Sequence, residues 1–362
     1  MNFIPIMHWL PKYSSSNLIL DFIGGLTIGI MHVPQGIAYA SLAQVPAVMG
    51  LYTSFFPPLF YAIFGTARQN SLGTFAVVSL MAGAVASRKV DLWNQIHKTS
   101  FNSSDIMMVM NSTSVTTVDV NVILVFTIGI VHIIMGLLRL SFVATYFSDQ
   151  VVAGFTTAAS MHVLVAQMKY IFNLPNLPMR SGPGELFLKC YDILNHIMSS
   201  NPYSIGISLI SIAFLLLSKL LLAPFIRKKF KITIPIPFEL LLIIIVTFFS
   251  TFFQLEKDFK MRVVGEIPTG LPKPRLPRFE MIPQIMGEAI GIAAVTFAVH
   301  ISLAKICAKK LKYDIDVDQE LFAIGLASIF SSFFSVFPVA CSLGRTMVNI
   351  SVGTKTQVFL YF

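Results

Sequence analysis

Long apolar runs separated by short polar stretches dominate the chain. A helix needs about 20 apolar residues to cross the hydrocarbon core of a bilayer. Runs of roughly that length lie at 19–42, 47–64, 120–138, 149–172, 203–222, 236–253, 287–307 and 319–335. The pattern therefore predicts an all-α polytopic membrane protein.

Two further apolar runs, 75–86 and 340–352, are too short to cross a bilayer. At about 1.5 Å of rise per residue, each reaches only about half of the hydrocarbon core. Each follows the start of a longer run, at Asp21 and at Gly287, by a similar number of residues. Matching interruptions in two halves of a chain indicate an inverted-repeat transporter. We therefore expect two half-helices.

Composition narrows the class of protein. The chain is 55% hydrophobic and 12% charged, whereas soluble domains carry about 25% charged residues. The net charge of +9 suits anionic lipid headgroups or a negatively charged solute, and no nucleic-acid-binding motif accompanies it. Neither the cysteines nor the histidines have metal-ligand spacing, and no catalytic motif is present. No enzyme, cofactor or metal is predicted.

Charge placement predicts the orientation of the spans. Basic clusters at 227–231 and 305–312 lie close to span ends, which favours a cytoplasmic N-terminus. The loop 88–119 is then extracellular, and its sequons at Asn102 and Asn111 predict glycosylation. A third sequon, at Asn349, falls in the second short apolar run and is interpreted as a chance match.

The starts of the two short runs are the candidate site. If both half-helices begin near the bilayer midplane, their unpaired N–H groups and dipoles face one gap and favour an anion. Ser342 and Thr74 can add hydroxyl groups there. In the first long run, Pro34 predicts a kink, and Gln35 and Tyr39 lie one turn apart on one face.

Charged residues in apolar runs allow two interpretations. Arg345 either raises the occupancy of the site by an anion, or it snorkels towards the membrane surface or forms a structural ion pair with Glu288. Glu288 itself either relays protons, neutralises Arg345 or repels a monovalent anion, or lies at the headgroup boundary without a special role. The remaining intramembrane candidates are interpreted as packed or interfacial histidines: His32, His132, His162 and His300.

Several motifs, in order along the chain, resemble one family. They are VPQGIAYA at 33–40, GLYTSFFP at 50–57, FGTAR at 64–68, DVDQEL at 316–321, GRT at 344–346 and GTKTQ at 353–357. Together they are similar to the sulfate permease (SulP) family of anion transporters, over nearly the whole chain.

The resemblance implies a fold of two inverted seven-span (7+7) repeats, split into core and gate domains. Residues 1–17 would be a cytoplasmic segment, 18–253 the first repeat (spans 1–7), 254–286 an extracellular linker rich in proline and basic residues, and 287–362 the first part of the second repeat (spans 8–10). Gate spans 11–14 and the STAS domain of the family would be absent, so the chain is expected to be truncated after about the tenth span.

The resemblance also implies a set of site residues. The anion-binding positions of the family match Gln35, Tyr39, Phe75, Ser342, Gly344 and Arg345, and Glu288 matches an acidic position implicated in ion coupling. Two departures stand out. Thr74 occupies a place where many members have proline, and Gly344 replaces a serine found in some members.

The implied function is secondary active transport of an inorganic anion by alternating access. Sulfate is the first expectation, with chloride, bicarbonate and oxalate as further substrates, and the family implies a homodimer in the plasma membrane. Two alternatives stay open. One is an anion channel or a voltage-responsive motor of the same fold, and the other is a non-transporting fragment.

Overall fold

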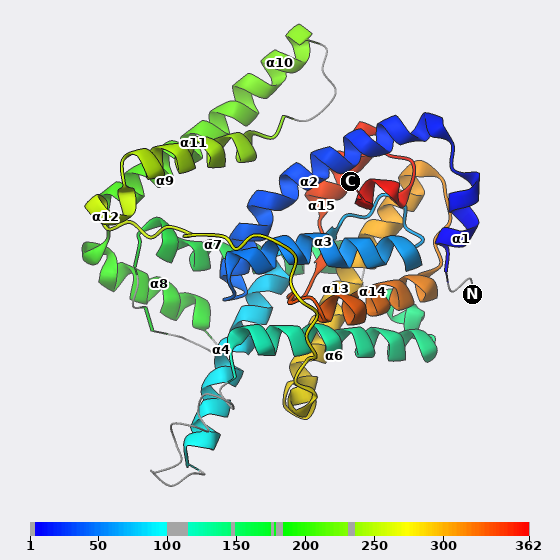
Figure 1. Cartoon of the computed structure of the whole chain (residues 1–362), viewed down its shortest axis with the longest axis horizontal. Coiled ribbons are helices and arrows are strands. Elements are labelled where there is room, and N and C mark those ends of the chain that lie inside the picture. The colour runs from blue at the N-terminus through cyan, green and yellow to red at the C-terminus, as the bar shows by residue number, and fades with distance from the viewer. Residues whose placement is uncertain are drawn as a thin grey trace. The chain divides into compact units, whose positions relative to one another are not determined.

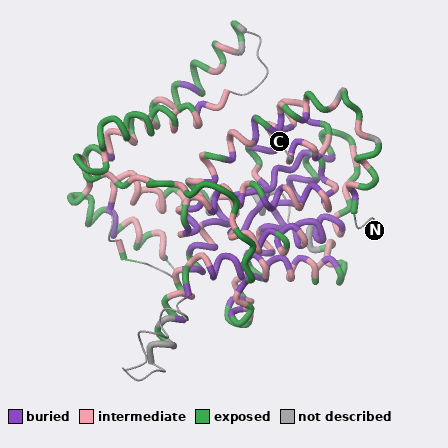
Figure 2. Tube along the Cα trace, in the orientation of Figure 1, coloured by how far each residue is buried: buried purple, intermediate pink, exposed green. Residues whose placement is uncertain are grey.

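The structure, a computed structural model, describes residues 4–99, 115–145, 149–174, 177–178, 184–230 and 236–361. Packing divides the chain into two units (Figure 1). Unit 1 comprises Met1–Val152 and Pro268–Phe362, and unit 2 comprises Ala153–Ile267. Most of the buried residues belong to unit 1 (Figure 2).

Unit 1 is a helical bundle with one small sheet at its centre. Its helices are α1 (Ile6–Trp9), α2 (Ser15–Leu42), α3 (Ala47–Phe64), α4 (Ala76–Thr99), α6 (Thr117–Leu137), α13 (Ile282–Leu311), α14 (Val317–Ser332) and α15 (Leu343–Val352). Strands β1 (Leu72–Gly73) and β2 (Ala340–Cys341) form an antiparallel pair. Helix α7 (Asp149–Ile171) leads from unit 1 into unit 2.

Unit 2 contains the remaining helices that the structure describes. They are α8 (Glu185–His196), α9 (Pro202–Leu217), α10 (Ala223–Phe230), α11 (Phe238–Phe252) and α12 (Leu255–Phe259). A π-helical turn at Ser218–Leu222 joins α9 to α10 without a break. The side-chain oxygen of Asn201 caps α9, and its side-chain nitrogen donates a hydrogen bond to the carbonyl of Phe259 at 2.7 Å. This residue therefore ties the start of α9 to the end of α12. Many large apolar side chains of α9 and α11 are exposed, as expected for helices that face lipid.

The fold class expected from the apolar pattern is confirmed. Within the described part of the chain, five helical segments have the length and apolarity needed to cross a membrane: 17–42, 47–64, 117–137, 202–226 and 279–311. The chain is a multi-pass membrane protein whose longest helices coincide with the long apolar runs.

The helices on the two short apolar runs have boundaries that differ from the sequence expectation, and α2 differs at its proline. Helix α4 begins next to Phe75, as expected, but continues to Thr99. Its second part is a polar stretch that starts near Ser87 and that the apolar pattern did not include. The second half-helix begins at Leu343 rather than at 340, because Ala340 and Cys341 are in a strand. Helix α2 passes through Pro34 without interruption.

The expected linker 254–286 is only partly irregular. It contains α12 and the first residues of α13, which starts at Ile282. Its part in unit 1 is fixed at several points. Arg275 donates from its backbone N–H to the carbonyl of Phe333 at 2.9 Å, and its guanidinium pairs with Asp119 at 2.8 Å. The hydroxyl of Tyr52 donates to the carbonyl of Gly270 at 3.2 Å.

Two crossovers lead into the central strands. Residues 65–71 connect α3 to β1, and residues 333–339 connect α14 to β2. The second crossover is held by aromatic packing, since Phe334 stacks on Phe56 with ring centroids 4.1 Å apart. It is also held by the backbone N–H of Phe337, which donates to the hydroxyl of Thr53 at 3.1 Å.

The chain beyond α15 is anchored on α2 by Asp21, a fully buried carboxylate. Asp21 accepts from the backbone N–H of Lys355 at 2.7 Å and from the hydroxyl of Thr356 at 2.6 Å. The hydroxyl of Tyr13 donates to the same carboxylate at 3.2 Å. These bonds fix the end of α15 independently of its start.

Helices α2 and α3 touch through glycine backbones. A Cβ atom at Gly50 would lie 1.9 Å from the carbonyl oxygen of Gly36, and one at Gly36 would lie 2.8 Å from the carbonyl oxygen of Gly50. Small residues allow this backbone-to-backbone approach between membrane helices.

Replacing Gly50 with alanine tests this contact. The added methyl group must push two backbones apart, so we expect Gly50→Ala to lower the free energy of unfolding by about 1–3 kcal/mol. Thermal unfolding of the detergent-solubilised protein measures the change. Gly206→Ala on α9, where nothing lies within 4 Å of the added Cβ, is the matched control. Equal unfolding temperatures for both variants would contradict the close approach.

Candidate functional site

The starts of α4 and α15 meet at the pair of short strands. Leu72 is opposite Cys341 and Gly73 is opposite Ala340. The pairing extends by one residue, since the backbone N–H of Ser342 donates to the carbonyl of Ser71 at 3.2 Å. Both helices begin within three residues of the end of their strand. Two helix N-termini from distant parts of the sequence therefore adjoin one sheet.

Each of these helix starts offers backbone donors. The first N–H groups of a helix have no partner within the helix, and the aligned peptide dipoles place partial positive charge there. The first helical bonds run from Ser79 to the carbonyl of Phe75 in α4 and from Thr346 to the carbonyl of Ser342 in α15. The side chain of Ser342 makes no capping bond. The N–H groups just before Ser79 and Thr346 can thus bind a negatively charged group.

Arg345, in the first turn of α15, brings a positive charge to these helix starts. Its side chain is fully buried. Its Nε donates to the hydroxyl of Ser71 at 3.1 Å, and its Nη1 donates to the side-chain oxygen of Gln35 at 2.6 Å and to the carbonyl of Thr74 at 3.0 Å. Its Nη2 is buried and makes no hydrogen bond within the described chain.

Two other polar atoms near Arg345 are also buried without a hydrogen-bond partner. The hydroxyl of Thr74 and the Nδ1 atom of His32 are buried, and neither has a hydrogen-bond partner in the part of the chain that the structure describes. His32 and Arg345 both lie close to Gly73. A Cβ atom added at Gly73 would lie 2.3 Å from Cε1 of His32 and 3.3 Å from Nη2 of Arg345. Buried polar atoms are normally paired, so this group of unpaired atoms is the feature to be explained.

The structure brings most of the predicted site residues together. Gln35 is bonded to Arg345, and Tyr39, half-buried on the same helix, interacts electrostatically with Arg345. Phe75 directly follows Thr74 and is half-buried beside the hydrophobic core. Ser342 is half-buried and Gly344 is exposed at the start of α15. A Cβ atom at Gly344 would meet only the hydroxyl of Ser342, at 3.9 Å.

Glu288 lies elsewhere. Its carboxylate pairs with Arg88 at 2.8 Å and with Lys89 at 3.0 Å, near the start of α13 and on the polar part of α4. The ion pair between Arg345 and Glu288 that the sequence allowed is therefore wrong. Arg88 and Lys89 follow the apolar part of α4, and they reach Glu288 because α4 continues beyond its apolar residues.

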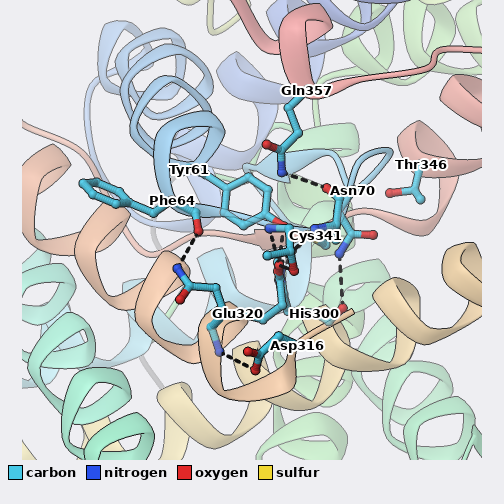
Figure 3. A network of polar contacts seen from close by, with 12 residues as sticks. Tyr61, Phe64, Asn70, His300, Asp316, Glu320, Cys341, Thr346 and Gln357 are labelled. Atoms are coloured by element: carbon cyan, nitrogen blue, oxygen red, sulfur yellow. Dashed lines mark hydrogen bonds and ion pairs between the residues drawn. The ribbon is translucent and has the colours of Figure 1, made fainter. Parts of the chain in front are cut away.

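Sequence reasoning missed a second polar cluster, centred on Glu320 in the first turn of α14 (Figure 3). Glu320 is fully buried and lies 2.5 Å from Nε2 of His300. An ionisable residue in an apolar run is itself a signal of function, but its partners come from distant helices. His132, by contrast, is a packed histidine whose Nε2 lies 3.0 Å from the carbonyl of Ala293.

The three predicted or possible glycosylation sequons have different outcomes. Asn102 and Asn111 lie outside the described residues, so their glycosylation stays a prediction. Asn349 is buried and donates to the carbonyl of Gln69 at 3.1 Å, which agrees with a chance sequon. No group of three or more histidine, cysteine or acidic side chains suited to a metal ion occurs among the residues that the structure describes.

Comparison with known proteins places these features in context. The profile of the Sulfate permease family matches residues 18–361. Prestin from Danio rerio is 39% identical over 357 residues, which cover 98% of this chain and 48% of that protein. The sulfate transporter of Ovis aries is 37% identical over 362 residues, which cover 98% of this chain and 49% of that protein. The chain spans about half the length of the curated relatives it matches.

Solved structures agree with the fold. The murine Solute Carrier 26 family member A9 anion transporter, in its inward-facing state, matches with a TM-score of 0.86 at 32% identity over 99% of this chain and 57% of that chain. The transmembrane domain of the cyanobacterial bicarbonate transporter BicA matches with a TM-score of 0.73 at 20% identity over 96% of this chain and 80% of that chain, which shows a shared fold alone.

The contact between His32 and Gly73 gives a test of the site's geometry. Gly73→Ala places a methyl group against the His32 ring, and the backbone φ of +153° at this residue adds strain. We expect Gly73→Ala to lower the free energy of unfolding by about 1–3 kcal/mol, and the cost to be smaller when His32 is also replaced by alanine. Thermal unfolding of the two single variants and the double variant measures the coupling.

Gly291→Ala, at a position on α13 with open space around the added Cβ, controls for the effect of a methyl group in general. Strictly additive costs for the two substitutions would contradict the packing of His32 on Gly73.

Proposed function

Because the chain belongs to the sulfate permease family, we propose that its protein is a secondary transporter that carries inorganic anions across a membrane by alternating access. Sulfate is the leading substrate, and chloride, bicarbonate and oxalate are the others. The activity is proposed for the whole protein, since the chain spans about half the length of its relatives. A homodimer in the plasma membrane completes the proposal.

The group of unpaired buried donors at the meeting point of α4 and α15 carries this proposal. Nη2 of Arg345 and the hydroxyl of Thr74 have no partner in the described structure, and two sets of helix-start N–H groups adjoin them. A bound anion would accept hydrogen bonds from all of these groups. Its negative charge would also offset the buried guanidinium, which is costly in a membrane when it has no counter-charge.

No covalent chemistry is needed for this function. Backbone N–H groups, a hydroxyl and a guanidinium replace the water molecules around the anion, and selectivity follows from how well they do so. Gln35 orients the guanidinium through its side-chain oxygen. Tyr39, Phe75, Ser342 and Gly344 are the partly accessible residues around these donors, and we propose that they contact the anion.

We do not include Glu288 in the proposed site. Its carboxylate is already paired with Arg88 and Lys89. A role for Glu288 in ion coupling would require that these pairs open during transport. The proposed binding of an anion at Arg345 does not depend on that step.

Replacing Arg345 with glutamine tests the proposal. Loss of a hydrogen-bonded charge costs about 1.5–3 kcal/mol, so we expect Arg345→Gln to weaken anion uptake about tenfold or more in KM or rate. Uptake of radiolabelled sulfate and chloride into cells that express the protein, normalised to the amount at the cell surface, measures it. Arg345→Lys keeps the charge but loses the planar guanidinium, so its uptake is expected to lie between that of the parent and that of Arg345→Gln.

Arg262→Gln, at an exposed arginine in unit 2, is the control and is expected to leave uptake unchanged. Uptake by Arg345→Gln equal to that of the parent would remove Arg345 from the site. Anion currents or a voltage-dependent capacitance without stoichiometric exchange would select a channel or a motor. No uptake of any anion by residues 1–362 alone, when the full-length protein is active, would select a non-transporting fragment.

A further inference from the structure

Glu320 connects α14 to the end of α3 and to the crossover 65–71 (Figure 3). Its carboxylate accepts from the hydroxyl of Tyr61 at 2.7 Å. It also accepts from the backbone N–H and the hydroxyl of Thr66, at 2.6 and 2.5 Å, and from the backbone N–H of Ala67 at 2.9 Å. These four donors come from chain segments about 250 residues away in sequence. One carboxylate therefore fixes the start of the crossover that leads to β1.

His300 extends this cluster to the second strand of the site. It lies in the middle of α13 and is almost fully buried. Its Nε2 lies 2.5 Å from Glu320, and its Nδ1 lies 3.0 Å from the sulfur of Cys341 in β2. Cys341 directly precedes Ser342, the N-cap residue of α15. One imidazole thus links the carboxylate to the strand that carries the second helix start.

The donor and acceptor atoms of Glu320 and His300 show why a glutamate and a histidine suit these two positions. A carboxylate has two oxygens that can accept all of these bonds, whereas a carboxamide presents an NH₂ group to N–H donors. An imidazole has two polar ring nitrogens, and those of His300 contact a carboxylate on one side and a sulfur on the other. Glutamine at 320 would therefore face the N–H groups of Thr66 and Ala67 with a donor or leave one of the partners unpaired.

Further bonds hold the same crossover. The side chain of Asn70 donates to the carbonyl of His300 at 3.3 Å, and the side chain of Gln357 donates to the carbonyl of Ala67 at 3.2 Å. Arg68 lies over the ring of Tyr313, 5.2 Å from its centroid. Burial raises the pKa of the Tyr313 phenol, which therefore remains a neutral ring beneath the guanidinium. Because these anchors and the hydrophobic core do not involve the Glu320 carboxylate, we expect unit 1 to fold without it.

We propose that Glu320 and His300 are positioning residues of the anion site. They hold the crossover 65–71 and strand β2 as one frame, so that the starts of α4 and α15 remain side by side at the distance an anion bridges. Neither residue contacts the anion. The inference rests on the proposed function only for its transport readout.

The test compares Glu320→Gln, Glu320→Asp, His300→Gln and the double variant Glu320→Gln/His300→Gln in the full-length protein. The exposed residues Glu280 and His162, changed to glutamine, are matched controls. Sulfate uptake gives KM and the maximal rate, cell-surface labelling gives the amount of protein, and hydrogen exchange gives the opening of backbone N–H groups at 65–73 and 340–346.

We expect Glu320→Gln to raise KM about tenfold, since one hydrogen bond to a charged group accounts for roughly that much, with a surface amount near that of the parent. His300→Gln is expected to give a smaller rise. The double variant is expected to match Glu320→Gln, because His300 loses its main partner when the carboxylate is gone. Glu320→Asp keeps the carboxylate and is expected to recover part of the affinity. Hydrogen exchange at both segments is expected to accelerate in the variants and not in the controls.

A KM within twofold of the parent in both single variants, with only a lower surface amount, would overturn the proposal and leave a purely structural role. Fully additive effects of the two substitutions would overturn the link between them. If Glu320→Gln does not reach the surface, His300→Gln and Glu320→Asp decide. If the parent carries no anion at all, the proposed function fails, and unchanged hydrogen exchange at 340–346 in His300→Gln would separately overturn the frame.

Discussion

Backbone N–H groups at membrane depth have no water to pair with, and this constraint bears on the core of any multi-pass membrane protein. Hydrocarbon offers no hydrogen bonds, so non-helical backbone at that depth must be enclosed by protein. The chain meets the constraint by pairing Leu72 and Gly73 with Cys341 and Ala340. The strands satisfy the backbone just before each helix start, and the first N–H groups of both helices remain without a partner within the helix. These N–H groups, together with Nη2 of Arg345 and the hydroxyl of Thr74, form the candidate site.

The apolar pattern predicted the helices well where bilayer thickness determined their length. It located both helix starts to within a few residues, because an apolar run that is too short for a span is a conspicuous feature. It failed at the other end of α4, which continues from Ser87 to Thr99 through polar residues. Hydrophobicity reports contact with lipid or core, whereas the helix is maintained by backbone bonds and ends where those bonds end.

The sequence predicted the positive charges of the candidate site, but it did not predict which side chains are hydrogen-bonded to one another. The positive ends of the two helices that begin after short polar breaks, and the charge of Arg345, follow from the order of residues alone. That Arg345 bonds Gln35 and Ser71 and not Glu288 follows from which helix faces meet in space. His32 and His300 are alike in sequence, each a single histidine in an apolar run. One packs on Gly73 beside the guanidinium, and the other bridges Glu320 and Cys341.

The pairing of β1 with β2 also constrains how the protein is made. The two strands are separated by most of the chain, so β1 leaves the ribosome long before its partner exists. Until residues 340–341 are synthesised, the start of α4 has no strand to pair with and must be sheltered by the insertion machinery or by neighbouring helices. The part of the molecule that we assign to the anion therefore cannot assemble until residue 341 has been made, and an interruption of synthesis before that point yields a chain without it.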